Sequence, residues 1–247
     1  MGDRLLKKLY VVGIGAGNYE GMTVGAVRAL GRVDLIVGYT VYCDLLKPYF
    51  PDKEFLSTPM MHEMERCRMA LEHAADGKVC AMVSSGDAGI YGMAAPVLAL
   101  APAYGVEVEV IAGVTAAASG AALLGAPLTA DFAVISLSDL LMPYEMIERR
   151  LCAAAQGDFC IVLYNPSSRK RADYLQKACE IVLRTRAPET VCGIAQNIGR
   201  AGESFRVLSL AELAKTPVDM FTTVFIGNST TACIGGKMVT PRSPVSQ

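Results

Sequence analysis

Glycines and small polar residues gather at three places in the sequence, each directly after an apolar run. These places are residues 13–18 (GIGAGN), 84–92 (SSGDAGIYG) and 113–116 (GVTA). Glycine has no Cβ, so a ligand can approach the backbone closely where it stands. In open α/β sheets, ligands bind beyond the carboxyl ends of the strands. The three stretches therefore predict a ligand site at one edge of a sheet.

The second stretch carries a carboxylate. Asp87 could orient a hydroxyl or an amine of a ligand, or it could cap a helix that begins near Tyr91, which is a common role for Asp. The small residues after Gly113 fit close packing against a ligand and equally fit packing against a neighbouring helix. The residue types leave both alternatives open at both places.

The first stretch is close to a dinucleotide-binding fingerprint but does not match it. The pattern GxGxxG needs glycine at position 18, where Asn18 stands. Asp34 precedes the second apolar run, whereas the acid that binds a ribose should follow it. A nicotinamide-dependent dehydrogenase is therefore disfavoured, and a tight turn without a ligand is the remaining alternative.

The elements that must position these residues alternate regularly. Short β-branched runs alternate with helical patterns, which is typical of βαβ units and mostly parallel sheets. The runs cover residues 9–12, 35–37, 79–83, 106–111, 132–137, 159–164, 191–195 and 220–226. Helices are expected over residues 24–30, 60–75, 144–155 and 170–185. Glycines within residues 199–203 predict a hairpin, and hence a mixed sheet in the second half.

The length of 247 residues fits two α/β domains. The boundary is expected in the Gly- and Ala-rich segment near residue 120, which gives an N-terminal domain over residues 1–119 and a C-terminal domain over residues 120–247. From Gly235 onward no periodicity is visible, so a loose C-terminal tail is expected.

The composition excludes several classes of protein. With 52% hydrophobic and 19% charged residues, the chain is globular rather than disordered. A formal net charge of −1 gives no electrostatic footprint for nucleic acid. The uncharged stretch over residues 110–130 is interrupted by glycines and a proline, which argues against a membrane span.

The cysteines and histidines indicate neither a disulfide framework nor a metal. The eight cysteines are scattered, with no CxxC spacing, and are expected to be reduced core residues. His62 and His73 have no acidic or thiolate partner at ligand spacing, so no metal site is expected. The chain begins without the pattern of a secretory leader, and a cytosolic protein is expected.

Taken together and in this order, the motifs resemble those of the tetrapyrrole methylase family. The likeness rests on VGIG (12–15), GDAGIYG (86–92) and GVTA (113–116), and covers about residues 8–232. GDAGIYG, Tyr39 with Tyr42, SDLL (138–141) and LYNPSS (163–168) are similar to the branch that methylates carbon 17 of a corrin precursor. One departure is Ala112, where the family usually has proline, and it should loosen that turn slightly.

The resemblance implies a homodimer of two α/β domains that binds S-adenosylmethionine in a cleft between them. Ala16, Asp87, Ile90, Thr115 and Ala116 would contact the methionine and ribose portions. Residues of the second domain would wall the adenine. The full set implied for the cofactor is Gly13, Gly15, Ala16, Gly86, Asp87, Gly89, Ile90, Tyr91, Thr115, Ala116, Leu163, Tyr164, Asn165, Gly227, Asn228 and Ser229.

For the acceptor, the resemblance implies a tetrapyrrole that carries many carboxylates. Arginines suit carboxylates, and Arg149, Arg169 and Arg200 are the candidates. Tyr39 and Tyr42 could stack on the macrocycle or simply be packed. The branch couples methylation to ring contraction, which would benefit from a proton donor or acceptor. Asp139 is the hypothesis for that group, with an N-cap role as the alternative.

Three other functions remain open. The acceptor could be the cobalt-bound intermediate of an anaerobic pathway rather than the metal-free one. The chain could be a sibling methylase acting on another position. A non-catalytic tetrapyrrole carrier, which would need no adenosyl cofactor, is an alternative of another class.

Overall fold

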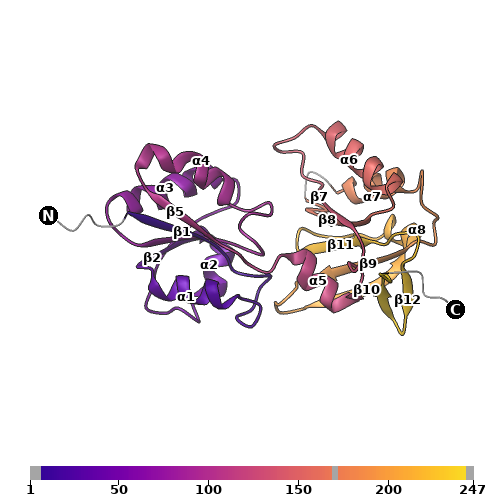
Figure 1. Ribbon diagram of the computed structural model, residues 1–247, viewed down its shortest axis with the longest axis horizontal. Helices are drawn as coiled ribbons and strands as arrows, with labels where there is room; N and C mark the ends of the chain where they lie inside the picture. Colours follow the sequence, from indigo (N-terminus) through magenta and orange to yellow (C-terminus); the bar gives the residue numbers. More distant parts are fainter. Residues whose placement is uncertain (1–6, 169–171, 243–247) are drawn as a thin grey trace. The chain divides into compact units, whose positions relative to one another are not determined.

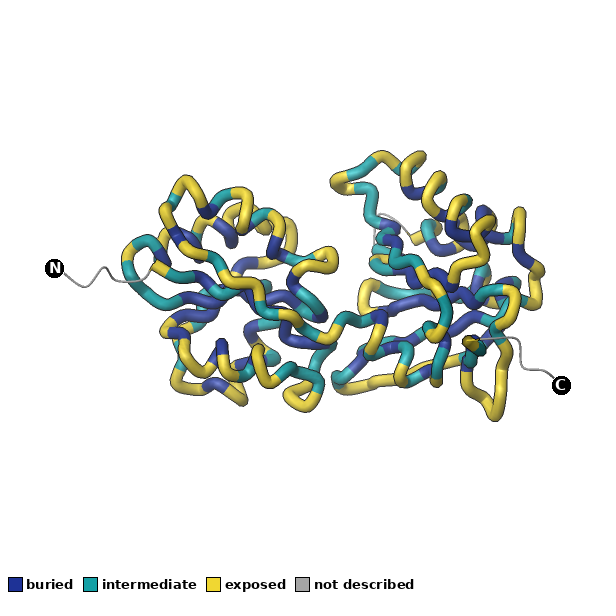
Figure 2. Tube along the Cα trace, in the orientation of Figure 1, coloured by how far each residue is buried: buried dark blue, intermediate teal, exposed yellow. Residues whose placement is uncertain are grey.

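The computed structural model describes residues 7–168 and 172–242. Arg169, one of the predicted acceptor residues, lies outside them. The chain divides into two compact units, Met1–Ala116 and Ala117–Gln247, called here the N-terminal and the C-terminal unit (Figure 1). Each unit has its own sheet and its own buried core, which Figure 2 shows in dark blue along the central strands.

The sheet of the N-terminal unit is parallel throughout. Its strands lie in the order β3-β2-β4-β1-β5, and every hydrogen-bonded pair runs in the same direction. The strands are β1 Lys8–Gly13, β2 Leu35–Tyr39, β3 Glu54–Thr58, β4 Cys80–Ser84 and β5 Glu107–Ile111. Their carboxyl ends therefore all lie at one edge of the sheet.

Helices cover both faces of this sheet. Helices α1 (Val24–Arg32) and α2 (Thr40–Leu46) pack on one face, and α3 (Glu63–Ala75) and α4 (Ala94–Tyr104) pack on the other (Figure 1). Val11 of β1 belongs to the core beneath α3 and α4, whereas Val12 belongs to the core beneath α1 and α2. Burial on both faces explains why the strand sequences lack polar alternation.

The sheet of the C-terminal unit is mixed, as the sequence predicts. Its order is β10-β9-β11-β8-β7; β7 and β8 are parallel, and the other neighbours are antiparallel. The predicted hairpin is present, with Gln196 opposite Ser204. The strands are β7 Phe132–Ser136, β8 Cys160–Tyr164, β9 Val191–Gln196, β10 Ser204–Ser209 and β11 Thr222–Ile226.

Helices also cover the mixed sheet. Helices α6 (Tyr144–Gln156), α7 (Tyr174–Val182) and α8 (Leu210–Leu213) contribute to the core on one face. Helix α5 (Ala116–Leu124) comes so close to the strands that a Cβ on Gly120 would lie 2.9 Å from the Phe225 ring. Gly120 therefore serves close packing within the protein.

Some elements differ from the sequence prediction. Strand β3 and helix α2 were not predicted; only Thr58 of β3 is buried, so its sequence shows no apolar run. The C-terminal segment is not wholly loose, because β13 (Lys237–Val239) pairs with β12 (Ala232–Ile234) and β6 (Gly125–Ala126). Met238, fully buried, anchors it.

Candidate functional site

Three loops meet at the carboxyl edge of the N-terminal sheet. They follow β1, β4 and β5, which are neighbours in the sheet. The amide of Gly15 donates to the carbonyl of Gly86 at 3.1 Å, and the amide of Gly86 donates back at 2.7 Å. Both glycines have positive φ values, 72° and 67°, which other residues adopt at a cost. The first two glycine stretches therefore form one paired structure.

The third loop packs closely against the backbone of this pair. A Cβ on Gly113 would lie 2.1 Å from the carbonyl oxygen of Gly86 and 2.6 Å from that of Gly13. A Cβ on Gly13 would lie 2.7 Å from the amide nitrogen of Gly113. Glycine is required at these positions by contacts within the protein, and Gly13, Gly15 and Gly86 are buried where the three loops meet.

Asp87 joins two of the loops. Its Oδ1 accepts from the amide of Gly89 at 2.8 Å, and its Oδ2 accepts from the amide of Gly113 at 2.9 Å. Helix α4 begins only at Ala94, with Met93 as its N-cap, so the helix-capping alternative for Asp87 is wrong. The carboxylate holds the β4 and β5 loops together at the edge where the sequence predicts a ligand.

The remaining predicted cofactor residues of this unit flank the same edge. Ile90 and Tyr91 are exposed, and Tyr91 has a positive φ of 54°, a conformation uncommon outside glycine. Ala16, Thr115 and Ala116 are half-buried. The structure therefore brings together all the predicted residues of the N-terminal unit, from Gly13 to Ala116.

The β1 loop is not a dinucleotide turn. The side chain of Asn18 accepts from the amide of Gly21 at 2.9 Å, and α1 starts only at Val24, capped by Thr23. A dinucleotide fingerprint would place the helix directly after the glycines. The loop instead extends well past the strand before the helix begins.

In the C-terminal unit, the ends of β7, β8 and β9 share one edge of the sheet. The hydroxyl of Tyr164 accepts from the amide of Ala117 at 2.7 Å, and Asn165 donates to the hydroxyl of Ser136 at 2.9 Å. Leu163 is fully buried in the core, so its side chain cannot wall a ligand. Asn165 and Asn197 follow their strands with positive φ values of 53° and 52°. Asn197 was missed by the sequence analysis, although asparagine after an apolar run favours such a conformation.

The structure separates Gly227, Asn228 and Ser229 from Tyr164. Strand β11 is antiparallel to β8, with Val224 opposite Leu163, so the two carboxyl ends lie at opposite edges of the sheet. Asn228 is about five strand positions, roughly 16 Å, from the level of Tyr164. The prediction that these segments together wall an adenine is therefore wrong.

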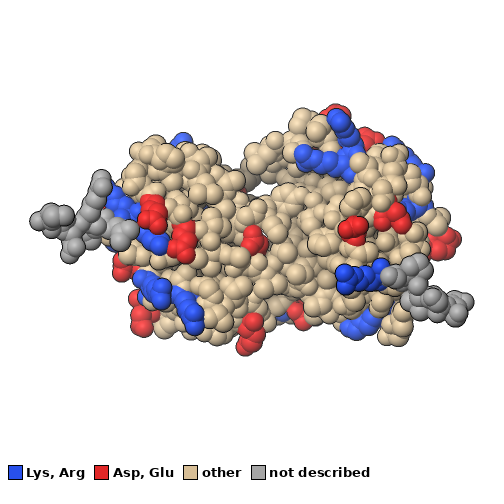
Figure 3. All heavy atoms as spheres, in the orientation of Figure 1, with Lys and Arg blue, Asp and Glu red and all other residues tan. Residues whose placement is uncertain are grey.

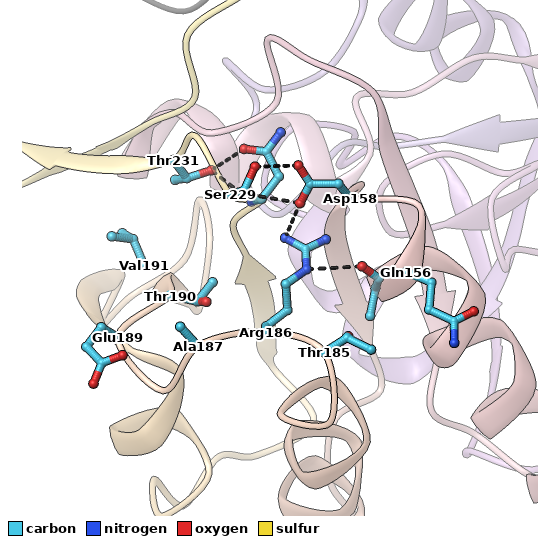
Figure 4. A pocket seen from close by; sticks show the side chains of 12 residues that line it. Gln156, Asp158, Thr185, Arg186, Ala187, Glu189, Thr190, Val191, Ser229 and Thr231 are labelled. Atoms are coloured by element: carbon cyan, nitrogen blue, oxygen red, sulfur yellow. Dashed lines mark hydrogen bonds and ion pairs between the residues drawn. The ribbon is translucent and has the colours of Figure 1, made fainter.

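The opposite edge holds a structural network in a groove of about 630 Å³ (Figure 4). The guanidinium of Arg186 pairs with Asp158 at 2.8 Å and donates to the carbonyls of Ala155, Phe159 and Gly227. The hydroxyl of Ser229 donates to the other oxygen of Asp158 at 2.6 Å. The guanidinium of Arg186 and the carboxylate of Asp158 therefore already have partners within the protein.

The predicted catalytic and acceptor residues lie in several places. Asp139 follows β7 and accepts from the hydroxyl of Tyr174 at 2.7 Å. Helix α6 begins at Tyr144 after Pro143, so Asp139 is not its N-cap. Tyr39 and Tyr42 form an edge-to-face pair with ring centroids 5.2 Å apart. Tyr39 ends β2, so it lies at the carboxyl edge of the N-terminal sheet.

The predicted arginines have different surroundings. Arg149 is exposed on α6, and its neighbour Arg150 contacts the sulfur of Met142 at 2.8 Å. Arg200 lies over the ring of Phe221, 5.7 Å from its centroid. In Figure 3, Lys and Arg side chains gather over the α6 part of the C-terminal unit.

Residues 7–168 and 172–242 also show which side-chain clusters and helices are absent from this part of the chain. They contain no group of three His, Cys, Asp or Glu side chains placed to hold a metal ion. No helix in these ranges has the length and apolarity needed to cross a membrane.

The chain belongs to the tetrapyrrole (corrin/porphyrin) methylases, whose family model matches residues 8–214. It is 44% identical over 236 residues to a probable cobalt-factor III C(17)-methyltransferase of Salmonella typhimurium, covering 95% of this chain and 98% of that protein. It is 41% identical to a precorrin-3B C(17)-methyltransferase of a Sinorhizobium species, with 92% and 91% covered.

A solved structure agrees with this assignment. The crystal structure of the methyltransferase CobJ superposes with a TM-score of 0.87 at 34% identity, covering 95% of this chain and 99% of that chain. The family cofactor is S-adenosylmethionine, as the resemblance implied. The predicted family and fold class are confirmed.

Proposed function

We propose that this protein transfers the methyl group of S-adenosylmethionine to carbon 17 of a corrin precursor, with associated ring contraction, in cobalamin biosynthesis. The acceptor would be precorrin-3B or its cobalt-bound counterpart, cobalt-factor III. The support is the similarity to proteins so named over more than nine-tenths of the chain. The observation that carries the cofactor part is the meeting of the Gly15, Asp87 and Gly113 loops at one sheet edge.

The residues of this edge fit a folded adenosyl cofactor. The backbone groups of Gly15 and Gly86 bond each other and hold the loops in place, and the exposed Gly89, Ile90 and Tyr91 beside them can contact the cofactor. Thr115 and Ala116 add small half-buried side chains. We assign the methionine and ribose contacts to this edge. Tyr164 and Asn165 remain the candidates from the C-terminal unit.

The bound cofactor supplies an electrophilic methyl group on a sulfonium. The protein must then hold the acceptor carbon in line with that methyl group, and such alignment is worth about 7–11 kcal/mol in well-oriented systems. Carbonyl oxygens near the methyl group can stabilise it without a dedicated base. The C–S bond breaks with its electron pair on sulfur as the new C–C bond forms.

Calorimetric titration tests the cofactor assignment. We expect S-adenosylhomocysteine to bind in the micromolar range, with no heat from NAD. Methyl transfer is then measured by mass spectrometry with the metal-free and the cobalt-bound acceptor in parallel. Binding of NAD without S-adenosylhomocysteine would reject the proposal, and pigment binding without either would indicate a carrier.

Asp139 is proposed to move a proton during ring contraction. The hydroxyl of Tyr174 holds its carboxylate at the end of β7. Asp139→Asn should slow contraction while methylation persists. Asp173→Asn is the matched control, since Asp173 is exposed and pairs with Lys177. Intact contraction in Asp139→Asn would reject this role.

We also propose that the protein is a cytosolic homodimer. Both statements come from the resemblance to the family. Analytical ultracentrifugation tests the dimer, and a sedimentation coefficient of a monomer at micromolar concentration would contradict it.

A further inference from the structure

A buried arginine in the N-terminal unit has no acidic partner. Arg66 on α3 is only 4% exposed. Its Nε donates to the hydroxyl of Thr58 at 2.9 Å, and its Nη2 donates to the carbonyl of Pro59 at 3.0 Å. Within residues 7–168 and 172–242, no carboxylate lies within 4.0 Å of its guanidinium, and Nη1 has no hydrogen-bond partner.

This arrangement is unusual because burying a charge is costly unless another charge compensates it. The nearest acids along the helix do not do so. Glu65 pairs with His62 at 2.5 Å, and Glu63 is exposed. By contrast, Arg186 of the C-terminal unit, also buried, has Asp158 as its partner. Arg66 therefore keeps an uncompensated positive charge with an unused pair of donors.

The location of Arg66 connects it to the candidate site. Thr58 is the last residue of β3 and lies opposite Tyr39 of β2. Thr40 also donates to the carbonyl of Thr58 at 3.2 Å. Because the sheet is parallel, this corner lies at the same edge as the Gly15, Asp87 and Gly113 loops. The edge thus has a glycine-rich half at β4, β1 and β5 and a second half at β3 and β2.

The second half also exposes an apolar surface. Met60, Met61 and Met64 are all exposed, Met61 by 73% and with a positive φ of 70°. Methionine side chains are flexible and polarizable, so they adapt to flat or irregular apolar ligands. Tyr39, whose ring packs edge-to-face on that of Tyr42, lies opposite Thr58 in the sheet, so aromatic side chains and methionines both belong to this corner and suit a macrocycle. The buried guanidinium supplies the charge that a peripheral carboxylate needs.

We propose that Arg66 binds a peripheral carboxylate of the tetrapyrrole acceptor, with the three methionines contacting the adjacent ring. This rests on the proposed function for the identity of the acceptor. The guanidinium fork, pre-oriented by Thr58 and Pro59, would present Nη1 to the carboxylate. A hydrogen bond between charged groups is worth about 1.5–3 kcal/mol, which corresponds to a roughly 10- to 100-fold change in affinity.

The test compares Arg66→Met with Arg68→Met, which removes an exposed arginine from the same helix. We expect Arg66→Met to raise the KM for the acceptor about 10- to 100-fold, with kcat and the Kd of S-adenosylhomocysteine nearly unchanged. Arg68→Met should leave all three unchanged. Arg66→Lys, which keeps the charge but loses the fork, should fall between them.

A structural role alone would give another result. In that case Arg66→Met would lower the melting temperature, and its KM for the acceptor would equal that of Arg68→Met once the folded fraction is corrected. If Arg66→Met does not fold, an unchanged KM in Arg66→Lys overturns the proposal.

A direct binding probe keeps this result separate from the proposed function. Fluorescence of uroporphyrin III, a carboxylate-rich tetrapyrrole, is titrated with each variant. Weaker uroporphyrin binding in Arg66→Met than in Arg68→Met supports the carboxylate site even where S-adenosylhomocysteine fails to bind. Equal binding in the two variants overturns the site, whereas failure of S-adenosylhomocysteine to bind the wild type overturns the methyltransferase.

Discussion

The two units differ in how strand direction places their loops. In the N-terminal unit all strands are parallel, so every loop at a strand's carboxyl end lies at the same edge. In the C-terminal unit β11 runs against β8 and β9, so loops at carboxyl ends are divided between two edges. Motifs of the first unit could therefore be grouped from sequence, and motifs of the second could not.

The same difference gives the two edges of the C-terminal sheet different roles. One edge carries Tyr164, Asn165 and Asn197, and the other carries the Arg186 and Asp158 network. We interpret the first as the ligand-facing edge and the second as structural. The following experiments test that division and the corresponding role of the N-terminal edge.

The largest effect is expected for Arg186→Met. The substitution removes donors from three carbonyls and leaves Asp158 without its cation. Leaving a buried carbonyl without its donor costs about 1–3 kcal/mol. The loss of three such bonds should therefore lower the unfolding free energy, measured by urea denaturation, more than any substitution below. The Kd of S-adenosylhomocysteine for the folded protein should stay unchanged.

Arg184→Met is the matched control, because Arg184 is 61% exposed and pairs with Glu148 at the surface. Its effect should stay within about 0.5–1 kcal/mol. A large loss of cofactor affinity in folded Arg186→Met would contradict the division of the two edges.

Gly113→Ala should have the next largest effect. The added Cβ would lie 2.1 Å from the carbonyl oxygen of Gly86, so the β4 and β5 loops must move apart. We expect a loss of about 1–3 kcal/mol in stability and a loss of S-adenosylhomocysteine binding in calorimetry. Gly31→Ala is the control: nothing lies near its Cβ, and alanine in a helix should stabilise by up to about 1 kcal/mol. Wild-type affinity in Gly113→Ala would show that this edge does not bind the cofactor.

Particular residues show which features of the fold and the site the sequence alone could predict. The glycines at 13, 15, 86 and 113 could be grouped because strand ends of a parallel sheet meet, and this needed only the βαβ rhythm. Asn228 could not be placed, because its position depends on the direction of β11, which no local pattern encodes. Arg66 was not noticed because a helical arginine looks solvated until its burial is known. Strand β3 was missed because an edge strand needs no apolar run.

Tyr164→Phe and Asn228→Ala compare the two edges of the C-terminal sheet. It removes the acceptor of the buried Ala117 amide, which should cost about 1 kcal/mol. Asn228→Ala, at the opposite edge, removes a side-chain oxygen that accepts from Thr230 and Thr231 and should cost a similar amount. Only Tyr164→Phe should weaken S-adenosylhomocysteine binding, by a few-fold in calorimetry. The reverse order of affinities would restore Asn228 as a cofactor residue.

The smallest effect on cofactor binding is expected from alkylation of the cysteines. The rate of alkylation at buried cysteines measures how often each unit opens. Burial raises the pKa of Cys43 and Cys80 in the N-terminal unit to about 11, and that of Cys179 in the C-terminal unit to about 12. At pH 8 these groups are thiols, whereas only the thiolate reacts. Iodoacetamide should therefore modify the exposed Cys233 first, as peptide mass mapping would show, and this modification should not lower cofactor affinity.

Since buried thiols react only when their unit opens, faster labelling of Cys43 and Cys80 than of Cys179 would mean that the N-terminal unit opens more often. Slowing of that labelling by S-adenosylhomocysteine, with Cys179 unaffected, would place the ligand on the parallel unit.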